Sequence, residues 1–180
     1  YWLFILALAL ALLACLFTSH PQDPGWSHLL SSNVIHNFGG RVGAWGVDLL
    51  LFVFGFSAYW WCVLLLRYVY LGWRELYQND VVTELYHCIV VGCGFSLLLS
   101  VSVALEALRF YRFGVLLPGD AGGVLGHVIA VWLQHLMGFN GATLLLLLLF
   151  AIGLSWFFQF SWLTLVERLG EWFENRYLAT

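Results

Sequence analysis

The chain has 180 residues, of which 62% are hydrophobic and only 9% are charged, and its mean hydropathy is +0.88. A soluble globular domain does not have this composition, which is that of a membrane protein. The seven basic residues are all arginines and the net charge is −3, which argues against a basic surface that binds nucleic acid by neutralising phosphates.

The first part of the chain predicts two membrane crossings separated by a loop. An apolar run at residues 1–17 predicts a first transmembrane helix. Residues 18–43 form the longest polar interval and predict an exposed loop, and residues 44–66 predict the second span. The chain starts at Tyr1 rather than methionine, and its last residues still follow a helical pattern, so we expect both ends to continue into a longer protein.

Residues 84–108 predict the third span. Small residues recur at every fourth position along it, which is typical of a face where transmembrane helices pack closely. This predicted packing stripe consists of Gly92, Ser96, Ser100 and Ala104.

The last third of the chain predicts three different kinds of helix. The apolar segment 124–137 reaches only about 21 Å at about 1.5 Å per residue, which is too short for a hydrocarbon core of roughly 30 Å. We expect it to be a re-entrant or interfacial helix, with a break at residues 138–141 before the last span, residues 142–160. Residues 161–178 separate apolar from charged positions and predict an amphipathic helix at the membrane surface. The predicted fold is therefore an all-α polytopic membrane protein with four spans.

Charged residues close to the apolar runs need partners, because an isolated charge is costly in a membrane. The spans place five of them near one membrane surface, which predicts a structural charge cluster. These residues are Arg41, Asp48, Glu106, Arg109 and Arg112. The alternative is a subunit of a transporter or channel in which Asp48 and Glu106 line a path.

Nothing in the sequence predicts catalytic, cofactor-binding or metal-binding residues. The segments at Ser57 and Ser96 lack the second glycine of a nucleophile elbow, so we expect each serine to be a packing residue. The histidines form no close ligand pair, and the four cysteines lie in or beside apolar runs, where they act as small hydrophobic residues. A membrane enzyme is the least favoured class.

Several loop motifs together resemble a known family. Asp-Pro-Gly-Trp-Ser begins at Asp23, and His-Asn-Phe-Gly-Gly-Arg-Val-Gly-Ala-Trp begins at His36. Leu-Pro-Gly at Leu117 and Gly-Ala-Thr-Leu at Gly141 follow in the same order. The chain resembles the membrane-embedded N-terminal region of the FtsK/SpoIIIE family of bacterial DNA translocases over nearly its whole length. The motif residues that we single out in the first external loop are Asp23, Pro24, Trp26, Asn37, Gly39, Gly40 and Trp45.

The resemblance implies a function that composition cannot give. It implies a membrane anchor in the bacterial inner membrane at the division septum, with both termini cytoplasmic. It also implies a linker and an ATP- and Mg-dependent motor that pumps double-stranded DNA, both absent from these residues. Through that motor the protein would be a hexamer and would reach DNA, and the spans would contact other divisome membrane proteins.

Overall fold

The computed structural model describes residues 1–27, 35–75, 84–110 and 121–178. Within these ranges the regular secondary structure is entirely helical. The elements are α1 (Trp2–Phe17), α2 (Gly40–Phe54), the 3-10 helix η1 (Gly55–Ala58), α3 (Tyr59–Glu75), α4 (Glu84–Arg109), α5 (Gly123–Phe158) and α6 (Trp162–Leu178).

The helices are long and apolar enough for a membrane protein. Among the described residues, three helical stretches could cross a membrane by length and composition, namely Gly40–Trp73, Cys88–Arg109 and Gly123–Phe158. The apolar helix Trp2–Phe17 is shorter. Gly40–Trp73 and Gly123–Phe158 are bent, so each consists of two shorter helical parts that run in different directions.

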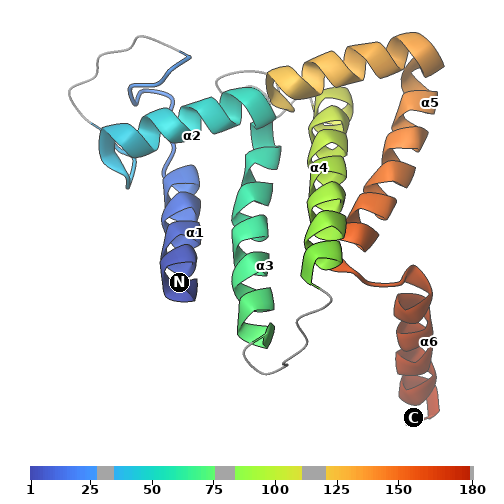
Figure 1. Ribbon diagram of the computed structural model, residues 1–180. Coiled ribbons are helices and arrows are strands. Elements are labelled where there is room, and N and C mark those ends of the chain that lie inside the picture. The colour runs from blue at the N-terminus through green and yellow to red at the C-terminus, as the bar shows by residue number, and fades with distance from the viewer. Residues whose placement is uncertain (28–34, 76–83, 111–120, 179–180) are drawn as a thin grey trace.

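The chain follows the same course twice (Figure 1). α1 and α3 run side by side, and α2 lies across them at one end. α4 and the second part of α5 repeat this pattern, with the first part of α5 lying across the same end of the molecule. Both termini lie toward the opposite end. We call α1 to α3 the first half and α4 to α5 the second half.

Glycines make the turn from the crosswise to the lengthwise direction in each half. Gly55 ends α2 with φ 57° and ψ −140°, and Gly138 interrupts α5 with φ 68° and ψ 173°. Only glycine adopts this combination readily, because a Cβ atom would clash with the backbone. The bend at Gly138 falls where the sequence predicts a break.

The bend at Gly55 differs from the expectation of one helix at residues 44–66. The structure divides that segment into the end of α2, η1 and the beginning of α3, which then continues to Glu75. Apolar residues continue on both sides of the bend, so hydropathy alone does not reveal it. Predicted and observed helix ends elsewhere lie within a few residues of one another.

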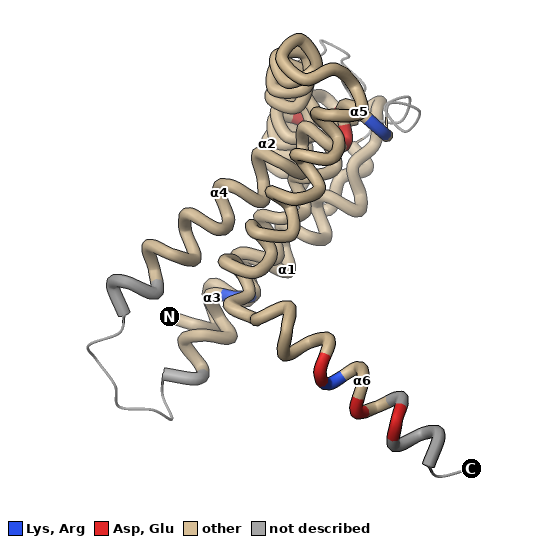
Figure 2. Tube along the Cα trace, turned by 90° about the vertical axis from the view of Figure 1, so that its right-hand side faces the viewer, with Lys and Arg blue, Asp and Glu red and all other residues tan. Residues whose placement is uncertain are grey.

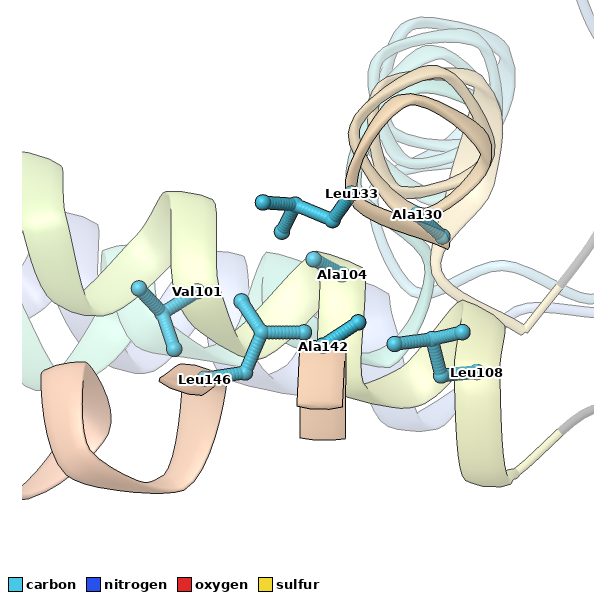
Figure 3. Close-up of a cluster of buried hydrophobic side chains, with 7 residues drawn as sticks. All are labelled: Val101, Ala104, Leu108, Ala130, Leu133, Ala142 and Leu146. Atoms are coloured by element: carbon cyan, nitrogen blue, oxygen red, sulfur yellow. The ribbon is translucent and has the colours of Figure 1, made fainter. Parts of the chain in front are cut away.

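A cluster of small and branched side chains joins α4 to both parts of α5 (Figure 3). Ala104 of α4 meets Ala130 from the crosswise part and Ala142 from the lengthwise part. Between helices in lipid, close van der Waals packing rather than the hydrophobic effect drives association, and small residues permit it. Gly153 continues the contact, since a Cβ there would lie 3.1 Å from the backbone nitrogen of Leu98.

Aromatic side chains join the two halves along their length. Trp60 and Trp61 of α3 pack beside Phe95 of α4 and Phe157 of α5. The Trp61 and Phe95 rings are 5.2 Å apart, and Phe95 and Phe157 are 5.7 Å apart. Arg67 places its guanidinium 5.2 Å from the centre of the Phe157 ring. α3 thereby contacts the second half through its aromatic and arginine side chains.

Candidate functional site

The half-buried carboxylate of Glu106 lies at the joint between the two halves. Ser57 in η1 donates its backbone N–H to Oε2 of Glu106 at 3.1 Å, and the Ser57 hydroxyl is 2.6 Å from Oε1. Ser102 places its hydroxyl 2.7 Å from that of Ser57, and the Trp60 indole N–H donates to it at 3.1 Å. Ser57 of η1 thus binds the Glu106 carboxylate of α4, and Trp60 of α3 binds the neighbouring Ser102.

The backbone forms a second part of the same joint. The Phe56 N–H donates to the carbonyl of Ala121 at 3.1 Å, immediately before α5 begins. Gly55 and Gly123 face each other so closely that a Cβ on Gly123 would lie 2.8 Å from the nitrogen of Gly55. We call this set of contacts the central joint: Gly55, Phe56, Ser57, Trp60, Ser102, Glu106, Ala121 and Gly123. It holds the bend of the first half against the beginning of the crosswise helix of the second.

The residues of the predicted charge cluster are distributed over separate contacts. Arg109 donates from Nε to the Thr143 hydroxyl at 3.3 Å and lies 4.5 Å from the centre of the Phe139 ring, whereas Glu106 is bound at the central joint. Asp48 is bound by a loop of the first half. Arg41 is exposed at the beginning of α2, and Arg112 lies outside the described residues. The cluster as a whole stays a prediction.

Asp48 is buried in α2 and fastens the preceding loop. It accepts hydrogen bonds from the Ser27 N–H at 2.7 Å and the Ser27 hydroxyl at 2.9 Å. Gly25 passes directly over the carboxylate, where a Cβ would lie 2.6 Å from Cγ of Asp48. Trp26 packs on Phe52 with ring centres 5.6 Å apart. The Asp-Pro-Gly-Trp-Ser motif therefore covers α2 in a fixed position.

A second set of contacts ties the loop to α1. Asp23 accepts the His36 N–H at 2.8 Å, and Asn37 donates from Nδ2 to the Cys15 carbonyl at 2.8 Å. Asn37 also accepts the Gly39 N–H at 2.9 Å. Gly40, with φ 61°, then starts α2.

The external-loop motif is thus a connected structural unit in the described residues. Pro24 lies between Asp23 and Gly25 in its covering segment, and Trp45 is half exposed on α2.

The four residues of the predicted packing stripe have different surroundings. Ala104 is fully buried against α5, whereas no other segment among the described residues lies within 4 Å of a Cβ placed on Gly92. Ser96 and Ser100 donate their hydroxyls to carbonyls one turn earlier in α4. Residues Gly92, Ser96 and Ser100 line a shallow open groove on the outer side of α4. A single packing face made of all four stays a prediction.

Ser57 differs from the expectation that it is only a packing residue. In the structure both its backbone and its hydroxyl bind Glu106. One signal could have found it, since a polar residue that follows a glycine break inside an apolar run requires a hydrogen-bond partner.

Comparisons with known proteins agree with this architecture. The family model described as the 4TM region of DNA translocase FtsK/SpoIIIE matches residues 1–170. The chain is 49% identical to DNA translocase FtsK 2 of Ralstonia nicotianae over 99% of the chain and 23% of that protein. It is 33% identical to DNA translocase FtsK of Pseudomonas syringae pv. syringae over 92% of the chain and 20% of that protein.

DNA translocase FtsK 1 of Neisseria meningitidis serogroup A is 31% identical over 99% of the chain and 22% of its own length. No solved structure gives a significant match. The chain therefore spans about a fifth to a quarter of the length of these relatives. This chain belongs to the FtsK/SpoIIIE family and corresponds to its multi-pass 4TM membrane region.

Proposed function

We propose that this chain is the inner-membrane anchor of a septal DNA translocase. It tethers a cytoplasmic, ATP-driven pump for double-stranded DNA and itself does no catalysis. The match of residues 1–170 to the 4TM region carries this proposal, because the relatives are named as DNA translocases and the chain covers only a small part of each. ATP, Mg²⁺ and DNA belong to the motor, which lies outside this chain.

The proposed topology has four crossings, made by α1, α3, α4 and the second part of α5. α2 and the first part of α5 lie at the outer surface of the inner membrane as interfacial or re-entrant helices. The position of both termini at one end of the molecule supports an even number of crossings (Figure 1). The family's cytoplasmic motor then assigns that end to the cytoplasm.

The distribution of charge supports the same topology. Figure 2 shows acidic and basic residues at the end that carries α2 and the first part of α5, and again along α6, with few between. An uncharged middle section is what a hydrocarbon core requires. The side chains described in α6 are exposed, with apolar Trp172 and charged Glu171 and Arg168 all accessible. On this proposal α6 lies at the cytoplasmic membrane surface and leads to the linker.

An anchor of this kind must resist force. A motor that pulls DNA exerts an equal opposite force on its own attachment, so the spans must transmit load without separating. The central joint and the aromatic contacts of α3 supply such a connection between the halves. Contacts with other divisome membrane proteins would use the exposed apolar faces that remain.

Septal targeting tests the proposed function. We expect a fluorescent protein fused after Thr180, with no motor present, to collect at the division site of dividing cells that also contain the native translocase. The matched control replaces this chain with an unrelated four-span anchor, which should distribute evenly around the membrane. Even distribution of both fusions would contradict a septal anchor that recognises divisome proteins.

A further inference from the structure

The two halves share a sequence repeat as well as a common course. Gly39-Gly40-x-x-Gly43 begins the crosswise helix of the first half, and Gly55-Phe56 ends it. At the same spacing, Gly122-Gly123-x-x-Gly126 begins the crosswise helix of the second half, and Gly138-Phe139 ends it. The two segments are therefore copies of one structural unit.

Backbone angles confirm the correspondence position by position. Gly39 and Gly122 have φ of −83° and −95° with ψ of 9° in both. Gly40 and Gly123 have φ of 61° and 64°. These left-handed values favour glycine at positions 40 and 123, whether or not a neighbouring unit packs against them.

Each crosswise helix also packs in the same way on the lengthwise helix before it. A Cβ on Gly39 would lie 2.7 Å from Sγ of Cys15 in α1, and one on Gly43 would lie 3.2 Å from the same atom. In the second half Gly122 and Gly126 both approach the Val103 backbone of α4. Cys15 of α1 thus corresponds to Val103 of α4.

The central joint shows how the end of one unit binds the beginning of the next. The Phe56 N–H donates to the Ala121 carbonyl, while Gly55 and Gly123 are both buried in the contact. Below this contact, Trp61 and Leu64 of α3 pack on the cluster around Phe95 in α4. The contact joins the end of one crosswise helix to the beginning of another. Because these two surfaces differ, further units could add to the pair through the same contact.

At the two outer ends of the pair, the described residues cover the same surfaces less completely. Phe38, which corresponds to the buried Ala121, is 71% exposed, whereas Phe139 and its counterpart Phe56 are both partly exposed, at 45% and 36%. Among the described residues, nothing beyond the adjacent backbone lies within 4 Å of a Cβ on Gly40 or Gly138, in contrast to Gly55 and Gly123.

The lengthwise helices show the same difference. Leu144 and Leu147, which correspond to Trp61 and Leu64, are 70% and 52% exposed. On α1, Leu10 corresponds to the fully buried Leu98 of α4 by the match of Cys15 to Val103, yet it is 53% exposed. The outer face of the second part of α5 and the outer face of α1 are thus open at the positions that are covered inside the chain.

We propose that a second copy of this chain binds head to tail by repeating the central joint between molecules. Gly138, Phe139 and the outer face of the second part of α5 bind Phe38, Gly40 and the outer face of α1 in the next copy. Both surfaces lie at the same depth, because the crosswise helices share one end of the molecule (Figure 1). A heterologous contact of this kind forms a ring when its rotation closes. The inference does not depend on the proposed anchor function.

Disulfide trapping in native membranes tests this arrangement in the protein as the cell makes it. The exposed Cys88 and Cys93 are first replaced by serine. Chains carrying Phe38→Cys and chains carrying Phe139→Cys are then expressed together and oxidised. We expect a disulfide-linked dimer from the mixture and none from either variant alone, and a ladder of multimers when one chain carries both cysteines.

An internal control shows whether the chain is folded and oxidation is effective. Phe56→Cys with Ala121→Cys occupies the corresponding positions inside one chain and should form an intramolecular disulfide, because their backbones are in hydrogen-bonding contact. The proposal is overturned if this control forms while the mixture gives no dimer. It is equally overturned if Phe38→Cys or Phe139→Cys alone forms dimers as efficiently as the mixture, which would indicate a symmetric or indiscriminate contact.

Discussion

Replacing Gly55 by alanine is expected to destabilise the chain by roughly 2–6 kcal/mol. The new Cβ imposes backbone strain of about 1–3 kcal/mol, because φ at this position is 57°. It also collides with the Ala121 carbonyl, and overpacking of this kind costs about 1–3 kcal/mol more. Thermal unfolding of the purified chain in detergent, followed by the fluorescence of its ten tryptophans, measures the loss.

Gly138→Ala is the matched control for this substitution. Gly138 makes the corresponding bend with φ 68°, but in the part of the chain that the structure describes, nothing beyond its own adjacent backbone lies within 4 Å of a Cβ there. Only the strain of about 1–3 kcal/mol should therefore appear in the isolated chain. Equal losses for the two variants would contradict the view that Gly55 is held in a close contact between the halves.

Glu106→Ala is expected to open the central joint. The substitution leaves the buried Ser57 N–H without its acceptor, and an unsatisfied buried group costs about 1–3 kcal/mol, whereas the Ser57 hydroxyl keeps its contact with Ser102. Glu106→Gln keeps one side-chain oxygen and should recover part of the loss. Chemical unfolding in mixed micelles measures the difference, and amide exchange at Ser57 should rise in the alanine variant.

Arg109→Gln tests whether Glu106 is held by Ser57 or by Arg109, its partner in the predicted charge cluster. Arg109 binds the Thr143 hydroxyl and the Phe139 ring, and it is exposed. We therefore expect its replacement to cost less than about 1 kcal/mol. A loss as large as that of Glu106→Ala, with no further loss in the double variant, would show that Glu106 depends on Arg109 instead of Ser57.

Hydropathy and glycine placement predict much of the fold. The segment 124–137 is too short to span, and three helix-disfavouring residues, Gly138, Asn140 and Gly141, follow it closely, so the second bend is visible in the sequence. The first bend has only Gly55 within a continuous apolar run, and a single glycine is often tolerated inside a helix. Its geometry depends on the contact with Ala121, which is distant in sequence.

The site is less predictable than the fold. Composition shows that Glu106 and Asp48 need partners, but charge proximity suggests arginines, whereas the structure supplies serines. Ser57 is 49 positions from Glu106, and Ser27 is 21 positions from Asp48. Packing of the two halves selects Ser57, and folding of the loop onto α2 within the first half selects Ser27. The external-loop motif could be identified by resemblance, although its hydrogen bonds could not.

Accessibility of single cysteines in membranes tests the four-crossing account most directly. Gln22→Cys lies beyond α1, Phe110→Cys follows α4, and Glu171→Cys lies in α6, with all three positions exposed. In a background with Cys88 and Cys93 replaced, an impermeant maleimide should label the first two in intact spheroplasts and the third only in inverted vesicles. Labelling of Gln22→Cys and Phe110→Cys from opposite sides would contradict the account, because an odd number of crossings would then separate them.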